Sequence, residues 1–141
     1  MKKNIIITVA LGLFLALTSC TKDDAPETAA SLIGKWEFSK EGVASGGQEV
    51  LVDYEHSTGC PKDFSTITAT TIVDTYFYGS NCAQDITNTA YTRSGNIISA
   101  KVDGVTQTVE IKTLDTNTLK IYGTDPDSPQ LKQVIVFTRV K

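Results

Sequence analysis

Short runs of alternating polar and apolar residues, separated by turn-forming residues, constrain the fold of this chain most strongly. From residue 32 onward no segment has the apolar spacing of an amphipathic helix, and threonine, valine, isoleucine and tyrosine dominate. Turn signals recur about every ten residues, as they do in sandwiches and barrels. Asp103-Gly104 separates two alternating runs and predicts a type I′ hairpin, because glycine tolerates a positive φ. The pattern therefore predicts an all-β domain.

Nine short segments are the expected strands of this domain. They cover residues 34–40, 49–54, 64–69, 71–78, 87–93, 96–102, 105–113, 119–124 and 131–140. Eight or nine antiparallel strands in meander order avoid exposed sheet edges most simply by closing into an up-and-down barrel. A barrel of about eight strands either fills its interior with side chains or holds one small ligand.

The first twenty residues predict export from the cytoplasm. Two lysines precede an uncharged apolar run at residues 5–17, whose 13 residues are too few for a transmembrane helix of about 20 residues. The Leu-Thr-Ser-Cys sequence at residues 17–20 resembles the lipobox of bacterial lipoproteins. In those proteins the cysteine thiol is joined to a diacylglycerol, and a peptidase then cleaves before the cysteine. The alternative is a plain signal peptide in which Cys20 is incidental.

The lipobox resemblance implies a division of the chain into three parts. Residues 1–19 form the signal peptide, residues 20–32 a lipidated N-terminus and flexible tether, and residues 33–141 the barrel domain. Several acyl chains on Cys20, palmitate among them, would hold the protein stably on a membrane. The compartment implied is the cell envelope of a Gram-negative bacterium, as an outer-membrane lipoprotein. Lys22-Asp23-Asp24 is either a signal for export to the outer surface or an ordinary acidic linker.

The charge balance argues against two classes of partner. The chain has a net charge of −3 and no basic cluster, which excludes a nucleic-acid binder. Removing two lysines with the signal peptide leaves 11 basic residues against 16 acidic residues, a net charge of −5. The folded domain should therefore not adhere to an anionic membrane without its lipid.

The two cysteines that remain after Cys20 predict one disulfide. Cys60 and Cys82 are an isolated pair in an exported chain, and exported chains form disulfides in oxidising compartments. A reactive or metal-binding thiol pair is the alternative. It has little support, because there is no Cys-x-x-Cys and the single histidine is His56, interpreted as a solvated loop residue.

The domain also resembles the lipocalin-like proteins that are common among bacterial lipoproteins. The resemblance is carried by the Leu-Ile-Gly-Lys-Trp opening at residues 32–36, the Cys-x-x-Asp corner at 60–63, the Leu-Lys-Ile strand at 119–121 and the closing Phe-Thr-Arg at 137–139. It implies that Trp36 packs at the closed end of the barrel, with Arg139 stacked over it. Such a cation–π contact contributes about 0.5 to 2 kcal/mol. The resemblance therefore implies that Trp36 and Arg139 form a structural plug of the barrel, and that Trp36 is not a ligand contact.

No residue constellation indicates an enzyme, a metal site or a cofactor. The candidates for ligand contacts are Tyr76, Tyr78 and Tyr91, whose apolar rings and polar tips suit a semi-polar pocket, and Asp74 inside its strand. The alternative is that the tyrosines pack in the core or lie on the outer face of the barrel, and that Asp74 faces solvent. The interpretation is a membrane-anchored module that binds a small, partly hydrophobic ligand. The alternative is a filled barrel that acts through its outer surface as a protein-interaction or structural module of the cell envelope.

Overall fold

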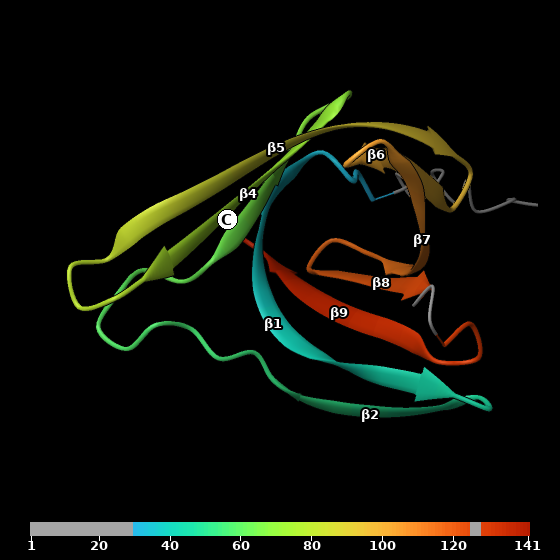
Figure 1. The fold of residues 1–141 in the computed structure, drawn as a ribbon, viewed down its shortest axis with the longest axis horizontal. Helices are drawn as coiled ribbons and strands as arrows, with labels where there is room; N and C mark the ends of the chain where they lie inside the picture. Colours follow the sequence, from blue (N-terminus) through green and yellow to red (C-terminus); the bar gives the residue numbers. More distant parts are fainter. Residues whose placement is uncertain (1–29, 125–127) are drawn as a thin grey trace, which may run out of the picture.

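The structure, a computed structural model, describes residues 30–124 and 128–141. The expected signal peptide, the Cys20 lipidation site and residues 20–29 of the expected tether lie outside these residues. The described residues form nine strands (Figure 1), namely β1 (Gly34–Ser45), β2 (Gln48–Asp53), β3 (Phe64–Ile67), β4 (Thr71–Tyr78), β5 (Ala83–Ser94), β6 (Ile97–Val102), β7 (Val105–Leu114), β8 (Thr118–Thr124) and β9 (Lys132–Arg139).

Eight of these strands close into an antiparallel barrel. From β3 to β9 each strand pairs with the next one along the chain, and β1 pairs with both β3 and β9. Residues 34–37 of β1 pair with β3, and residues 40–45 pair with β2, so β2 continues the same edge of β1. The long β1 curves from one pairing to the next (Figure 1). The predicted all-β up-and-down barrel is confirmed.

Glycine shapes the sheet at two places, one in a turn and one within a strand. Asp103 and Gly104 have φ angles of 51° and 81°, so both central residues are positive and the predicted type I′ hairpin is confirmed. The expected end of the first strand at residue 40 is too early, since β1 continues to Ser45. Gly42 lies within the strand, where an added Cβ would meet the Val50 carbonyl oxygen at 1.9 Å. Glycine is required there because β2 packs so closely against β1.

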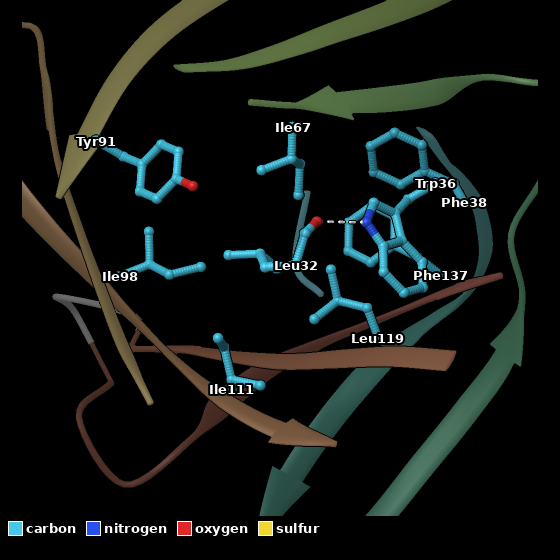
Figure 2. Close-up of a cluster of buried hydrophobic side chains, with 9 residues drawn as sticks. All are labelled: Leu32, Trp36, Phe38, Ile67, Tyr91, Ile98, Ile111, Leu119 and Phe137. Atoms are coloured by element: carbon cyan, nitrogen blue, oxygen red, sulfur yellow. Dashed lines mark hydrogen bonds between the residues drawn. The ribbon is translucent and has the colours of Figure 1, made fainter. Parts of the chain in front are cut away.

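The buried core lies at one end of the barrel, called here the closed end. Figure 2 shows nine side chains that converge there, from seven strands and from the segment before β1. Trp36 is fully buried, and its Nε1 donates a 2.9 Å hydrogen bond to the Leu32 carbonyl (Figure 2). Leu32 itself is only 3% exposed and belongs to the core cluster, so the buried core begins one residue before the expected start of the barrel domain.

The predicted disulfide is present. The Cys60 and Cys82 sulfur atoms are bonded at 2.08 Å across a sequence separation of 22 residues. Cys60 belongs to the segment between β2 and β3, and Cys82 belongs to the turn between β4 and β5. The bond therefore fastens the longest irregular segment of the described chain to the β4–β5 hairpin.

Candidate functional site

A cavity of about 190 Å³ opens inside the barrel directly above the core. Its floor is made by side chains of the core cluster, such as Ile98 and Leu119, and its wall reaches Val102, the residue before the β6–β7 turn. The end of the barrel formed by the β1–β2, β4–β5 and β6–β7 turns is called here the open end. The cavity is lined by Phe38, Ser65, Ile67, Ile72, Asp74, Tyr76, Ile98, Ala100, Val102, Gln107, Val109, Leu119, Ile121, Ile135 and Phe137.

Strand alternation explains this lining. In each barrel strand every second side chain points inward, so Ile72, Asp74 and Tyr76 of β4 enter the cavity together. Seven strands contribute in this way, and most of the side chains are aliphatic or aromatic. Such a surface gains free energy when it is covered by an apolar molecule, because water leaves it.

The polar part of the lining centres on one carboxyl group. Asp74 is partly buried, and it accepts a hydrogen bond from the Ser65 hydroxyl, whose residue is 2% exposed. Burial raises the pKa of Asp74 above its ordinary range, because water no longer stabilises the charged form well, and the Ser65 hydrogen bond offsets part of that rise. Burial and the nearby Asp74 charge raise the pKa of Tyr76 to about 12, so the phenol stays neutral.

Two of the four expected ligand contacts do not line this cavity. Tyr78 follows Tyr76 on the same face of β4, but it lies beyond the cavity at the strand end and is 55% exposed. Tyr91 points inward but lies in the core at the closed end (Figure 2), where its hydroxyl donates a 2.7 Å hydrogen bond to the Thr68 carbonyl. Of the expected residues, the structure brings Asp74 and Tyr76 together at the cavity.

The closed end is sealed by an arginine. The Arg139 guanidinium carbon lies 4.0 Å from the Trp36 ring centroid. Arg139 also donates hydrogen bonds to the carbonyls of Ser31, Ile33 and Thr116. A cation over an aromatic ring is held by the negative face of the π system. Trp36 is not among the cavity-lining residues.

His56, which was expected to be a solvated loop residue, connects two backbone segments through hydrogen bonds, so that interpretation is wrong. His56 Nε2 donates a 3.0 Å hydrogen bond to the Phe38 carbonyl, and the Asp63 backbone N–H donates one of 3.0 Å to Nδ1. A carbonyl can only accept, so the ring is neutral and carries its proton on Nε2. The Asp63 carboxylate in turn accepts a 2.7 Å hydrogen bond from the Phe77 N–H. No residue pattern in the sequence signals these backbone contacts.

The described ranges contain no cluster of three or more histidine, cysteine, aspartate or glutamate side chains that could hold a metal ion. In the same part of the chain, no helix is long and apolar enough to cross a bilayer.

The barrel and its cavity can be compared with known proteins. The sequence profile of the lipocalin-like domain matches residues 32–121. The chain belongs to the lipocalin-like domain family. Members of this family are typically non-enzymatic binding proteins. No curated protein matches the chain.

Several solved structures resemble this lipocalin-like domain. A lipocalin-like protein from Bacteroides uniformis ATCC 8492 has a TM-score of 0.51 and 14% identity, covering 77% of this chain and 98% of that one. An uncharacterized protein from Bacteroides eggerthii DSM 20697 has a TM-score of 0.49 and 12% identity, covering 78% and 100%. Bovine odorant binding protein in complex with undecanal has a TM-score of 0.47 and 11% identity, covering 85% and 78%. At 14% identity the likeness to the Bacteroides uniformis protein concerns the fold alone.

Proposed function

We propose that this protein is a membrane-anchored lipocalin-like lipoprotein that binds a small, partly hydrophobic molecule inside its barrel without covalent chemistry. The observation that carries the proposal is the cavity itself. It is concave, mostly apolar and furnished with a few convergent polar groups, namely Asp74, Ser65, Tyr76 and Gln107. Binding sites for small molecules have this composition.

The cavity size limits the ligand. An apolar cavity of about 150 Å³ in another protein holds benzene. The cavity here, at about 190 Å³, therefore suits one aromatic ring or a short branched chain with a small polar group. This cavity alone is too small to enclose a whole long-chain lipid. A longer molecule can extend toward the open end, where a second hollow of about 460 Å³ shares Gln107, Val109, Ile121 and Ile135 with it. The alternative of a filled barrel that works only through its outer surface leaves this cavity without a role.

The anchoring part of the proposal rests on the lipobox resemblance. A lipid on Cys20 would be followed by residues 21–31 as a tether, and an extended chain spans about 3.3–3.6 Å per residue. The tether thus reaches far enough for the open end to stay in the aqueous phase. We place the protein in the outer membrane of a Gram-negative bacterium, facing either the periplasm or the surroundings.

Ligand capture can be tested with a variant that fills the cavity. Ala100 lines the cavity, whereas Ala90 is exposed on β5 and is not part of the lining. The full chain and its Ala100→Trp and Ala90→Trp variants are expressed in the native host, purified from the envelope in detergent and denatured, and released small molecules are measured by mass spectrometry. A molecule that accompanies the wild type and Ala90→Trp but not Ala100→Trp supports the proposal. The same small molecules in equal amounts from all three proteins would contradict it.

A further inference from the structure

We infer that the ligand carries a cationic ammonium group on a small apolar body, and that Asp74 is the residue that recognises this group. The inference rests on the proposed function, because it requires the cavity to be a binding site. It is carried by the position of Asp74 in the cavity and by the charges on the inner face of the barrel. The inner face is defined here as the face of the strands that carries the cavity-lining side chains.

Asp74 is the one charged side chain among the fifteen described residues that line the cavity. Within the described ranges its carboxylate forms no ion pair, and Ser65 is the residue that donates a hydrogen bond to it. A carboxylate can accept about four hydrogen bonds. Burying a charge beside apolar groups is costly unless it is paired, so the site is incomplete without a further donor.

Toward the open end, the other charged side chains on the inner face are also acidic. Asp85 pairs with Tyr76 across β4 and β5, and Glu41 pairs with Ile135 across β1 and β9. Residues directly opposite each other in antiparallel strands share a face, so both carboxylates lie on the inner face, and both are exposed. A molecule that approaches the cavity from the open end therefore passes acidic groups.

No basic side chain of the described strands balances these carboxylates near the cavity. The basic residues of the inner face in these strands are Arg93, which pairs with Ile98, and Arg139, which pairs with Trp36. Both lie at the closed end and donate to backbone carbonyls, Arg93 to Gly95 at 2.7 Å and Arg139 to the β7–β8 turn at 3.0 Å. Neither side chain is among the cavity-lining residues.

These features favour ammonium over the two other common polar groups on small ligands. An ammonium donates three hydrogen bonds, and its positive charge would give Asp74 the ion-pair partner that the barrel strands do not supply. A hydroxyl offers one hydrogen bond and no charge. A carboxylate places a second negative charge in a poorly solvated space, where the two groups repel each other. We therefore expect the order of affinity to be amine, then alcohol, then acid.

Three matched ligands test this order. The full chain in detergent is titrated at neutral pH by calorimetry with 2-phenylethylamine, 2-phenylethanol and 3-phenylpropanoate, which share one ring and differ in the polar group. We expect the amine to bind about tenfold or more tightly than the alcohol, as a hydrogen bond to a charged group implies. Acid binding should be weaker still.

Two variants assign the preference to Asp74. Asp74→Asn should reduce the affinity for the amine about tenfold and leave that for the alcohol within about twofold. Asp53→Asn is the control, because it removes the same charge from an exposed side chain that is 87% accessible and paired with Lys40. It should keep the amine preference. Melting temperatures and circular dichroism of both variants establish that they fold. Partition of the ligands into the detergent is the same for all three proteins and therefore cancels in the comparison.

Each outcome has a distinct meaning. A wild-type protein that binds the amine and the alcohol equally well contradicts the ammonium inference and leaves the proposed binding function standing. An amine preference that survives in Asp74→Asn contradicts the role of Asp74. If none of the three ligands binds and no small molecule accompanies the protein from its host, both the inference and the proposed function are wrong.

Discussion

The Arg139 guanidinium and the Trp36 indole form a stacked pair that joins the first and last strands of the barrel, with 4.0 Å between the guanidinium carbon and the ring centroid. The two residues are also direct partners in the β1–β9 pairing that closes the barrel. Because Arg139 donates to carbonyls before β1 and in the β7–β8 turn, one side chain connects three segments that are distant in sequence. The pair therefore stabilises closure of the barrel and not the cavity above it.

The first prediction concerns this plug. Trp36→Ala should reduce the free energy of unfolding by about 3–5 kcal/mol, because it empties a fully buried site in a packed core. The loss should be the same with and without ligand, since Trp36 is not part of the cavity lining. Urea unfolding followed by circular dichroism measures it. Ile97→Ala, at a side chain that is 41% exposed, is the control and should cost far less. An unchanged melting temperature for Trp36→Ala would sink the assignment.

Alternation in the sequence was sufficient to predict the strands, their antiparallel order and the closed barrel. Alternation did not predict the structure of residues whose conformation depends on tertiary contacts. The Gly/Ser-rich composition of residues 42–47 is typical of a loop, yet Gly42 lies in β1 because β2 packs against it too closely for a side chain. Leu32 looked like the end of a tether, and it is buried because the chain crosses the closed end before β1 begins.

For the site, the sequence indicates the face of a residue but not its depth along the barrel. Asp74, Tyr76 and Tyr78 alternate on one face of β4, and the first two reach the cavity while the third lies beyond it. Tyr91 also points inward, but at the level of the core. Depth depends on strand register and barrel stagger, which arise from pairing across the whole sheet. His56 was missed for a related reason, since its partners are backbone groups of other segments.

The second prediction concerns the disulfide. Replacing Cys60 and Cys82 by serine should lower the free energy of unfolding by about 3 kcal/mol, as expected for a cross-link that closes a loop of this length. The loss arises mainly in the unfolded chain, whose ends are no longer held together across 22 residues. A reducing agent should lower the melting temperature of the wild type to that of the double variant. It should leave the double variant unchanged, and a wild type that does not respond to reduction contradicts the prediction.

The third prediction concerns His56. His56→Ala removes the acceptor for the Asp63 N–H and the donor to the Phe38 carbonyl, and each group left unpaired costs about 1–3 kcal/mol when it is buried. Chemical unfolding should detect a clear loss, whereas Glu55→Ala at the exposed neighbouring position should have little effect. Nitrogen-15 NMR of the wild-type ring should show the proton on Nε2. A ring protonated on Nδ1 is incompatible with the hydrogen bonds described here.

The fourth prediction concerns the membrane anchor. Cells grown with labelled palmitate should incorporate the label into the wild-type protein and not into Cys20→Ser, because the thiol is the proposed site of acylation. The variant should also lose its mature, processed size on a gel. Cys60→Ser/Cys82→Ser is the control and should still be labelled, since those thiols are bonded to each other. Equal labelling of the wild type and Cys20→Ser refutes the lipoprotein assignment.

The fifth prediction follows from the raised pKa of Asp74. Burial makes the folded protein bind this proton more tightly than the unfolded chain, so the folded state holds more protons in the range just above the ordinary pKa of 3.8. The contribution of Asp74 to the free energy of unfolding must therefore fall as the pH rises through that range, until the carboxyl is ionised in both states. Asp74→Asn keeps the shape and the Ser65 contact but has no charge to bury. It should match the wild type at low pH and exceed its stability at neutral pH.

The difference between variant and wild type isolates Asp74, because other carboxyl groups titrate in both proteins. Asp53 offers a control of opposite sign. Its pKa is lowered by the Lys40 hydrogen bond and charge, so its small contribution is present above the ordinary pKa and is lost as the pH falls. Asp53→Asn should accordingly be slightly less stable than the wild type at neutral pH. Urea unfolding of the three proteins from low to neutral pH measures both trends, and a stability gain for Asp74→Asn that does not change with pH contradicts the burial of its charge. The buried Asp74 carboxylate thus destabilises the folded protein on its own, and a cation bound beside it would remove that destabilisation.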